Sequence, residues 1–97
     1  MKKTFPLHLP DKNPERVLES VKNEVRKYVR REQGKKLPEG FNRRIFACKV
    51  GPDAAAAVER PLSEVVPSID TTAKSGSAQV YVEIVATPVH RPTTDDQ

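Results

Sequence analysis

The side chains that could act as a nucleophile or a general base are few and lie far apart in the sequence. The chain of 97 residues has one cysteine, Cys48, and two histidines, His8 and His90. Covalent catalysis needs a nucleophile beside a base. The sequence has no His-Glu-x-x-His, Cys-x-x-Cys, Gly-x-Ser-x-Gly or glycine-rich phosphate loop to supply such a pair. Cys48 occupies an inward position of an expected strand, as small core residues do. We therefore expect a protein that is not an enzyme.

Ligands for a metal ion are equally sparse. A zinc site needs three or four Cys, His or carboxylate side chains in one cluster. The adjacent acidic residues Asp95 and Asp96 stand in a polar tail and do not make such a cluster. We expect no metal and no cofactor.

Cations are the most abundant groups that could bind a partner. Residues 1–50 carry 14 Lys/Arg against 6 Asp/Glu, a net +8, whereas residues 51–97 carry 3 against 7, a net −4. A basic helix and the loop after it could contact the phosphates of a nucleic acid. The candidates for that contact are Arg26, Lys27, Arg30, Arg31, Lys35 and Lys36. The alternative is a solvated face, because glutamates interleave with these cations and cations also complement the end of a helix dipole.

The spacing of apolar residues predicts the elements that would position these groups. Residues 78–87 alternate for ten positions, and residues 3–9 and 44–50 alternate over shorter stretches, which is typical of strands. In the first strand Phe5, Leu7 and Leu9 are expected inward. Residues 14–33 repeat at helical spacing and follow Asn13, a good helix cap.

The second helix and a short third strand are harder to delimit. A helix is expected from Leu62 or Ser63 to Gly76, with Pro67 either bending it or beginning it. Its inward face is expected to hold Leu62, Val66, Ile69 and Ala73, with Val65 beside them. Residues 57–60, between a Gly-Pro-Asp turn and Pro61, are interpreted as a strand that returns to close a hairpin.

This order of elements predicts an α+β fold, the ferredoxin-like β-α-β-β-α-β plait, with two helices on one face of an antiparallel sheet. We expect the first and last strands to be central. Pro6 conflicts with a central first strand because proline cannot donate a ladder hydrogen bond, so it favours an edge position or a bulge there, or a different topology. The alternative is a three-stranded α+β layer in which residues 54–60 are loop.

The sheet face without helices is the second candidate surface. The alternation places His8, Tyr81, Glu83 and Val85 on it, and in the second strand Ile45, Ala47 and Lys49 also point away from the core. One face of an antiparallel sheet can be solvated. Because this face combines Tyr81 and Val85 with few charges, it favours a protein partner or a homodimer.

The domain and its compartment follow from length and composition. Residues 1–88 are long enough for a single domain, and residues 89–97 are expected to be a disordered polar tail. No apolar run reaches the roughly 20 residues of a membrane span, so we expect no membrane partner. A lone cysteine favours the cytoplasm.

Three segments carry a resemblance to known sequences. They are Met1-Lys2-Lys3-Thr4-Phe5-Pro6-Leu7, Asn13-Pro14-Glu15-Arg16-Val17 and Ala78-Gln79-Val80-Tyr81-Val82-Glu83-Ile84. The chain, up to about Pro92, resembles a small bacterial family of proteins of unknown function. The resemblance implies a complete, single-domain bacterial protein and no activity, cofactor or catalytic residue. We therefore expect a small, basic interaction module that self-associates through its open sheet face, with nucleic-acid binding as the alternative.

Overall fold

The elements of the chain alternate as β-α-β-β-α-β. The computed structural model describes residues 1–89, and the predicted tail lies outside these residues from position 90 onward. The elements are β1 (Lys2–Pro6), α1 (Pro14–Gly34), β2 (Arg43–Gly51), β3 (Val58–Arg60), a short 3-10 helix (Leu62–Glu64), α2 (Val65–Lys74) and β4 (Gln79–Val89). The last strand therefore extends two residues beyond the predicted end.

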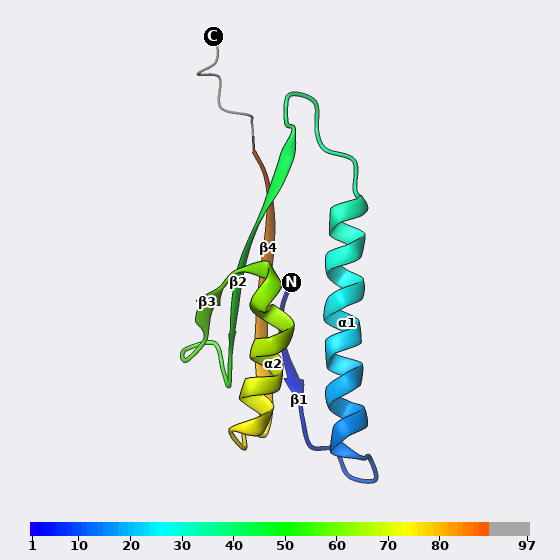
Figure 1. Ribbon diagram of the computed structural model, residues 1–97, viewed down its shortest axis with the longest axis vertical. Coiled ribbons are helices and arrows are strands. Elements are labelled where there is room, and N and C mark those ends of the chain that lie inside the picture. The colour runs from blue at the N-terminus through cyan, green and yellow to red at the C-terminus, as the bar shows by residue number, and fades with distance from the viewer. Residues whose placement is uncertain (90–97) are drawn as a thin grey trace.

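The strands form one antiparallel sheet in the order β1-β4-β2-β3. Both helices lie on the same side of this sheet and leave the other side uncovered (Figure 1). The predicted two-layer α+β fold is confirmed. The three-stranded alternative is wrong, because Val58–Arg60 pairs with β2 as a fourth strand.

The position of β1 removes the difficulty that Pro6 raised. The last strand is central, as predicted, but β1 lies at the edge of the sheet rather than in its centre. A proline is tolerated in an edge strand, where one side of the backbone needs no partner. The strand ends at Pro6, so the expected inward position of Leu9 is wrong, and this side chain is exposed in the following loop.

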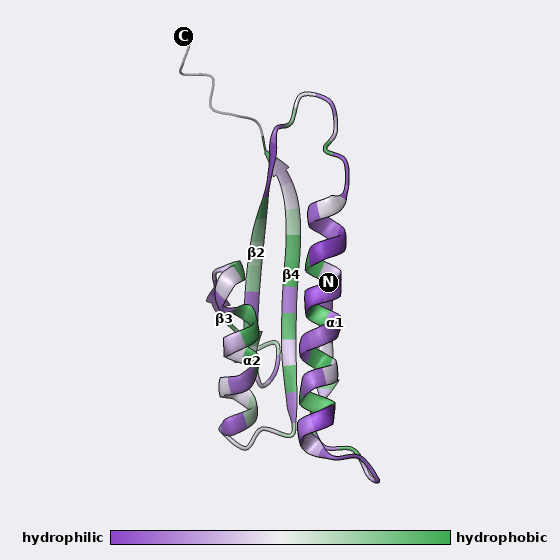
Figure 2. Cartoon of the chain, turned by 45° about the vertical axis from the view of Figure 1, so that its right-hand side comes forward, coloured by the Kyte–Doolittle hydropathy of each residue, from purple (hydrophilic) through white to green (hydrophobic). Residues whose placement is uncertain are grey.

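The core lies between the sheet and the two helices. Its centre is the inward face of β4, where Val80, Val82 and Ile84 are fully buried. Figure 2 shows hydrophobic and hydrophilic residues alternating along β4, and the inward residues of this alternation are buried. The other members of the core cluster are Phe5, Leu7, Val21, Val25, Cys48, Val50, Val65 and Ile69. Burial of each large side chain in this cluster stabilises the fold by about 1.5–3 kcal/mol relative to leaving that side chain exposed to water.

The first helix follows its sequence signals closely. The side chain of Asn13 accepts a hydrogen bond from the backbone N–H of Glu15 at 2.8 Å, and Pro14 occupies the first helical position. The buried face of the helix is Val17, Val21 and Val25. These residues recur every four positions, which keeps one stripe of α1 against the sheet.

The second helix differs from its prediction at its start and in its face. A 3-10 turn precedes it and α2 begins at Val65, so Ser63 is not its cap. Pro67 is then the third residue of the helix. A backbone N–H at this position would have no acceptor within the helix, so the proline removes no helical hydrogen bond and the helix need not bend. The buried face is Val65, Ile69 and Thr72, whereas Val66 and Ala73 are only half-buried beside it.

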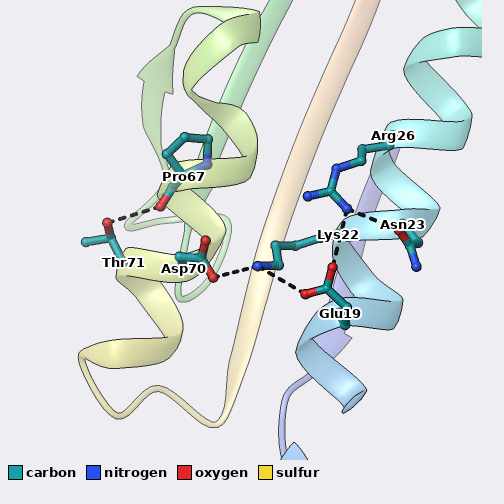
Figure 3. A network of polar contacts seen from close by, with 7 residues as sticks. All are labelled: Glu19, Lys22, Asn23, Arg26, Pro67, Asp70 and Thr71. Atoms are coloured by element: carbon teal, nitrogen blue, oxygen red, sulfur yellow. Dashed lines mark hydrogen bonds and ion pairs between the residues drawn. The ribbon is translucent and has the colours of Figure 1, made fainter. Parts of the chain in front are cut away.

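A lysine joins the two helices across the top of the core (Figure 3). The Lys22 ammonium lies 2.9 Å from Oδ1 of Asp70 on α2 and 3.3 Å from Oε2 of Glu19. The hydrogen bond to Asp70 raises the pKa of Lys22 above its ordinary value. The side chain of Lys22 is only 13% exposed, so a charge without a partner here would be costly.

Replacing Lys22 by methionine should lower the free energy of unfolding by about 1 kcal/mol, the range of a partly screened, charge-assisted hydrogen bond. The raised pKa stabilises the fold at pH values below the ordinary lysine pKa, and this stabilisation is lost as the pH rises through the raised pKa. Urea denaturation between pH 7 and 11 measures both effects. Lys27→Met on the same helix is the control and should cost little. Equal losses for the two variants would contradict a specific bridge.

Candidate functional site

The uncovered sheet face is built from alternate residues of all four strands. The pairing registers fix its members. They are Lys2, Thr4 and Pro6 of β1, Gln79, Tyr81, Glu83, Val85, Thr87 and Val89 of β4, Arg43, Ile45, Ala47 and Lys49 of β2, and Glu59 of β3. We call this surface the uncovered face.

A row of four charges crosses the middle of the uncovered face. Lys2 is paired with Glu83, Glu83 with Lys49, and Lys49 with Glu59. The signs along the row therefore alternate from one edge of the sheet to the other. Opposite charges in directly opposed positions attract each other across strands. We call these four residues the charge row.

Tyr81 holds one member of the charge row in place. Its hydroxyl donates a hydrogen bond of 2.7 Å to Oε1 of Glu83, the next residue on the same face. This hydrogen bond raises the pKa of Tyr81, because ionisation would set two negative charges side by side. The carboxylate of Glu83 is thus oriented by Tyr81.

Beyond the charge row, the uncovered face becomes apolar. Here β2 and β4 continue as a two-stranded ribbon past the ends of β1 and β3 (Figure 1). Ala47 is opposite Val85, and Ile45 is opposite Thr87. The exposed fractions of Ile45 and Val85 are 47% and 39%, so apolar surface gathers at this end of the sheet. An exposed apolar patch with a charged border is a common feature of interaction sites.

The structure brings together three of the four residues predicted for a protein interface. Tyr81, Glu83 and Val85 lie on the uncovered face. His8 does not, because β1 ends before it, and it lines a depression with Leu18 of α1 and Ala73 of α2. Lys49 and Glu59 complete the site. The alternation of residues 44–50 already placed Lys49 on this side. Only the strand pairing shows that Lys49 lies between Glu83 and Glu59.

Three of the six predicted nucleic-acid contacts are engaged by neighbouring side chains. Arg26 pairs with Glu19 at 3.5 Å, Lys35 pairs with Glu32 at 2.6 Å, and Arg31 lies over the ring of Tyr28. The remaining three are exposed. They are Lys27, Arg30 and Lys36.

Two of these exposed cations line separate depressions. Lys27 lines a depression with Asn23 and Glu24, whereas Arg30 borders another with Val66 of α2. Nothing in the structure of residues 1–89 supports nucleic-acid binding, which stays a prediction.

The residues considered for catalysis and metal binding remain separate in the fold. Cys48 is 4% exposed in the core, and burial raises the pKa of its thiol. Among residues 1–89, no three His, Cys, Asp or Glu side chains form a group that could hold a metal ion. His90 lies outside the described residues, as do Asp95 and Asp96.

Comparisons with known proteins identify a family without an assigned role. A family model described as "Family of unknown function (DUF6172)" matches residues 1–95. No curated protein and no solved structure matches the chain. Within residues 1–89, no helix is both long enough and apolar enough to span a bilayer.

The thiol of Cys48 should not react with a disulfide reagent at pH 8 in the native protein, because it is both buried and held in its protonated form. It should react fully in about 6 M guanidinium chloride, where the chain is unfolded. Absorbance of the released thiolate measures both rates. Ala55→Cys, in the exposed loop before β3, provides a matched reactive thiol. Labelling of native Cys48 at the rate of Cys introduced at position 55 would contradict a core role.

Proposed function

The chain belongs to the family of unknown function DUF6172, and from the geometry of its sheet we propose that it is an interaction module that pairs with a second copy through the uncovered face. The observation that carries this proposal is the order of signs in the charge row. Read from β1 to β3 the row is plus, minus, plus, minus, and read backwards every sign is reversed.

A pattern that reverses its signs when read backwards is complementary to itself. Consider two copies face to face, related by a two-fold axis that runs along the strands between β2 and β4. Lys2 of one copy then meets Glu59 of the other, and Glu83 meets Lys49. All four positions face an opposite charge, and a two-fold interface uses the same surface on both copies.

The charge row also selects the direction of the axis. A two-fold axis that crosses the strands along the row would place Lys2 opposite Lys2 and Glu83 opposite Glu83. Like charges in contact disfavour that arrangement. The axis along the strands also keeps the two sheets aligned, as in face-to-face sheet packing.

The apolar end of the uncovered face supports the same arrangement. With the axis along the strands, Val85 of one copy faces Ala47 of the other, and Ile45 faces Thr87. Burial of these side chains adds hydrophobic stabilisation to the charge pairing. The face has fewer residues than the roughly 20–30 a side of a standard interface, so we expect a dissociation constant of about 1–100 µM.

The proposal is a binding role without catalysis. The candidate nucleophile, Cys48, is in the core, which supports a structural part for it. We further infer a cytoplasmic protein, because the lone cysteine has no second one with which to form an internal disulfide and thiols stay reduced there.

Two charge reversals test the charge row without relying on the stability of either variant. Lys49→Glu and Glu83→Lys should each place like charges opposite one another in a self-pair and leave the protein monomeric. Mixed in equal amounts, they should form a heterodimer, because every position of the row then meets an opposite charge. Sedimentation velocity over about 5–500 µM protein measures the oligomeric state of each variant alone and of their mixture. Mixing cannot repair a folding defect within one chain. Dimerisation recovered on mixing therefore shows that the two variants pair through the charge row.

The control is Lys74→Glu, an exposed position on α2 that changes the net charge by the same amount as Lys49→Glu. It should dimerise like the unaltered protein. Far-ultraviolet circular dichroism shows whether each variant is folded. A monomeric unaltered protein at 500 µM, or a mixture that stays monomeric while the unaltered protein dimerises, would falsify the proposal.

A further inference from the structure

The outer edge of β1 carries backbone groups that no strand pairs. Met1 and Ile84 exchange two hydrogen bonds, of 2.6 and 2.7 Å, and the N–H of Leu7 donates to Ala78 at 2.9 Å. In an antiparallel ladder such hydrogen-bonded residues alternate with residues whose N–H and C=O point the other way. Lys2 and Thr4 are the alternate residues. Their backbone donors and acceptors therefore point outward from the sheet, as does the carbonyl of Pro6.

A groove of about 740 Å³ runs beside this edge, between β1 and α1. Its floor is apolar, with the buried side chains of Phe5, Val17 and Val21 and the exposed Leu9. Its lining comes from β1, the loop after it and the outer side of α1, so the groove opens beside the unpaired backbone and not over β4. An edge with free donors and acceptors next to an apolar groove is the arrangement that accepts an added strand.

The charges around the groove favour an acidic strand. Glu24 on its rim is already paired with Lys3 at 2.7 Å, and the ammonium of Lys3 lies 4.9 Å from the centre of the Phe5 ring. Lys12 and Arg16 line the other end of the groove, together with Asp11. These two cations have no ion-pair partner among residues 1–89.

The turn that presents Lys12 is an unusual one. Asp11 has a φ of 62°, the left-handed conformation that aspartate tolerates better than most residues. The N–H of Lys12 closes the turn on the carbonyl of Leu9 at 3.3 Å. The backbone thus holds Lys12 at the mouth of the groove.

We propose that an extended, acidic segment of a partner protein adds to β1 as a fifth strand, with alternate apolar side chains in the groove. The charge row supports the acidic chemistry. A fifth strand would place one residue beside Lys2, and an acidic residue there continues the alternation of signs across the uncovered face. On the other side of the added strand, apolar residues cover the floor of the groove and acidic residues beyond them reach Lys12 and Arg16.

The same lysines disfavour a second copy at this edge. β1 carries Lys2 and Lys3, and edge lysines protect natural sheets from pairing with a second copy. This site is separate from the proposed dimer, which uses the face of the sheet and not its edge. It is available in a monomer as well as in a dimer.

The decisive variant is Thr4→Pro, with Thr4→Ala as its matched control. Proline removes the outward N–H of residue 4, whereas the ladder to β4 uses residues 3 and 5 and stays intact. The probe is a fluorescein-labelled octapeptide, Glu-Glu-Glu-Val-Glu-Val-Glu-Glu, which has valines flanked by glutamates on the groove side and only glutamates on the other, and its binding is followed by fluorescence anisotropy. We expect the unaltered protein and Thr4→Ala to bind it alike, and Thr4→Pro to bind at least about tenfold more weakly, as for a lost backbone hydrogen bond.

Charge reversal at the groove provides a second test. Lys12→Glu combined with Arg16→Glu should weaken binding of the acidic peptide at least about tenfold, whereas Lys74→Glu should leave it unchanged. The same octapeptide with lysine in place of every glutamate should bind at least about tenfold more weakly than the acidic one, because electrostatic complementarity selects the partner.

Hydrogen exchange keeps the proposal testable if Thr4→Pro does not fold. In the unaltered protein, the acidic peptide should slow exchange of the Thr4 amide, which becomes paired, and leave that of Lys27 unchanged. The Lys49→Glu variant should show the same protection, since it removes only the proposed dimer. Equal binding by Thr4→Pro and Thr4→Ala, equal binding of the acidic and basic peptides, or an unprotected Thr4 amide in the presence of saturating peptide would overturn the proposal.

Discussion

The structure depends on the pairing of one strand, β4, with β1 on one side and β2 on the other. The inward residues of this strand, Val80, Val82 and Ile84, have no exposed surface and form the centre of the core. Because side chains alternate along a strand, the register that buries these three also fixes which residues lie on the uncovered face. A slip by one residue would bury Tyr81 and Glu83 and expose the valines. The hydrophobic pattern of β4 therefore determines both faces of the sheet.

The helices contribute to this arrangement in different ways. α1 is long and strongly amphipathic and covers the sheet with Val17, Val21 and Val25. α2 is short and is joined to α1 by the ion pair between Lys22 and Asp70. With both helices on one side, the opposite side of the sheet and the edge beside β1 remain for contacts with other molecules (Figure 1). The fold thus separates the surface that maintains the core from the surfaces open to partners.

Local patterns in the sequence predicted the elements, and tertiary pairing decided the surfaces. The periodicity of α1 and the alternation of β4 each depend on near neighbours in the chain, so both could be read without a structure. Strand order could not, because no local residue records which strands become neighbours. Pro6 favoured an edge position or a bulge in the first strand, but the expected topology placed that strand in the centre, and the loop position of His8 escaped prediction. The charge row likewise joins four separate strands, and its sign pattern exists only in the assembled sheet.

The central place of β4 has a consequence for how the chain folds. Met1 is hydrogen-bonded to Ile84, 83 positions away in the sequence, and no ladder joins β1 to β2 directly. Contacts between distant parts of a chain slow folding, because a long loop must close before they form. During synthesis α1 and the β2–β3 hairpin can form early, but β1 must wait for the last strand. Until then Phe5 and Leu7 lack their core partners in β4, and apolar residues exposed in this way during folding promote aggregation.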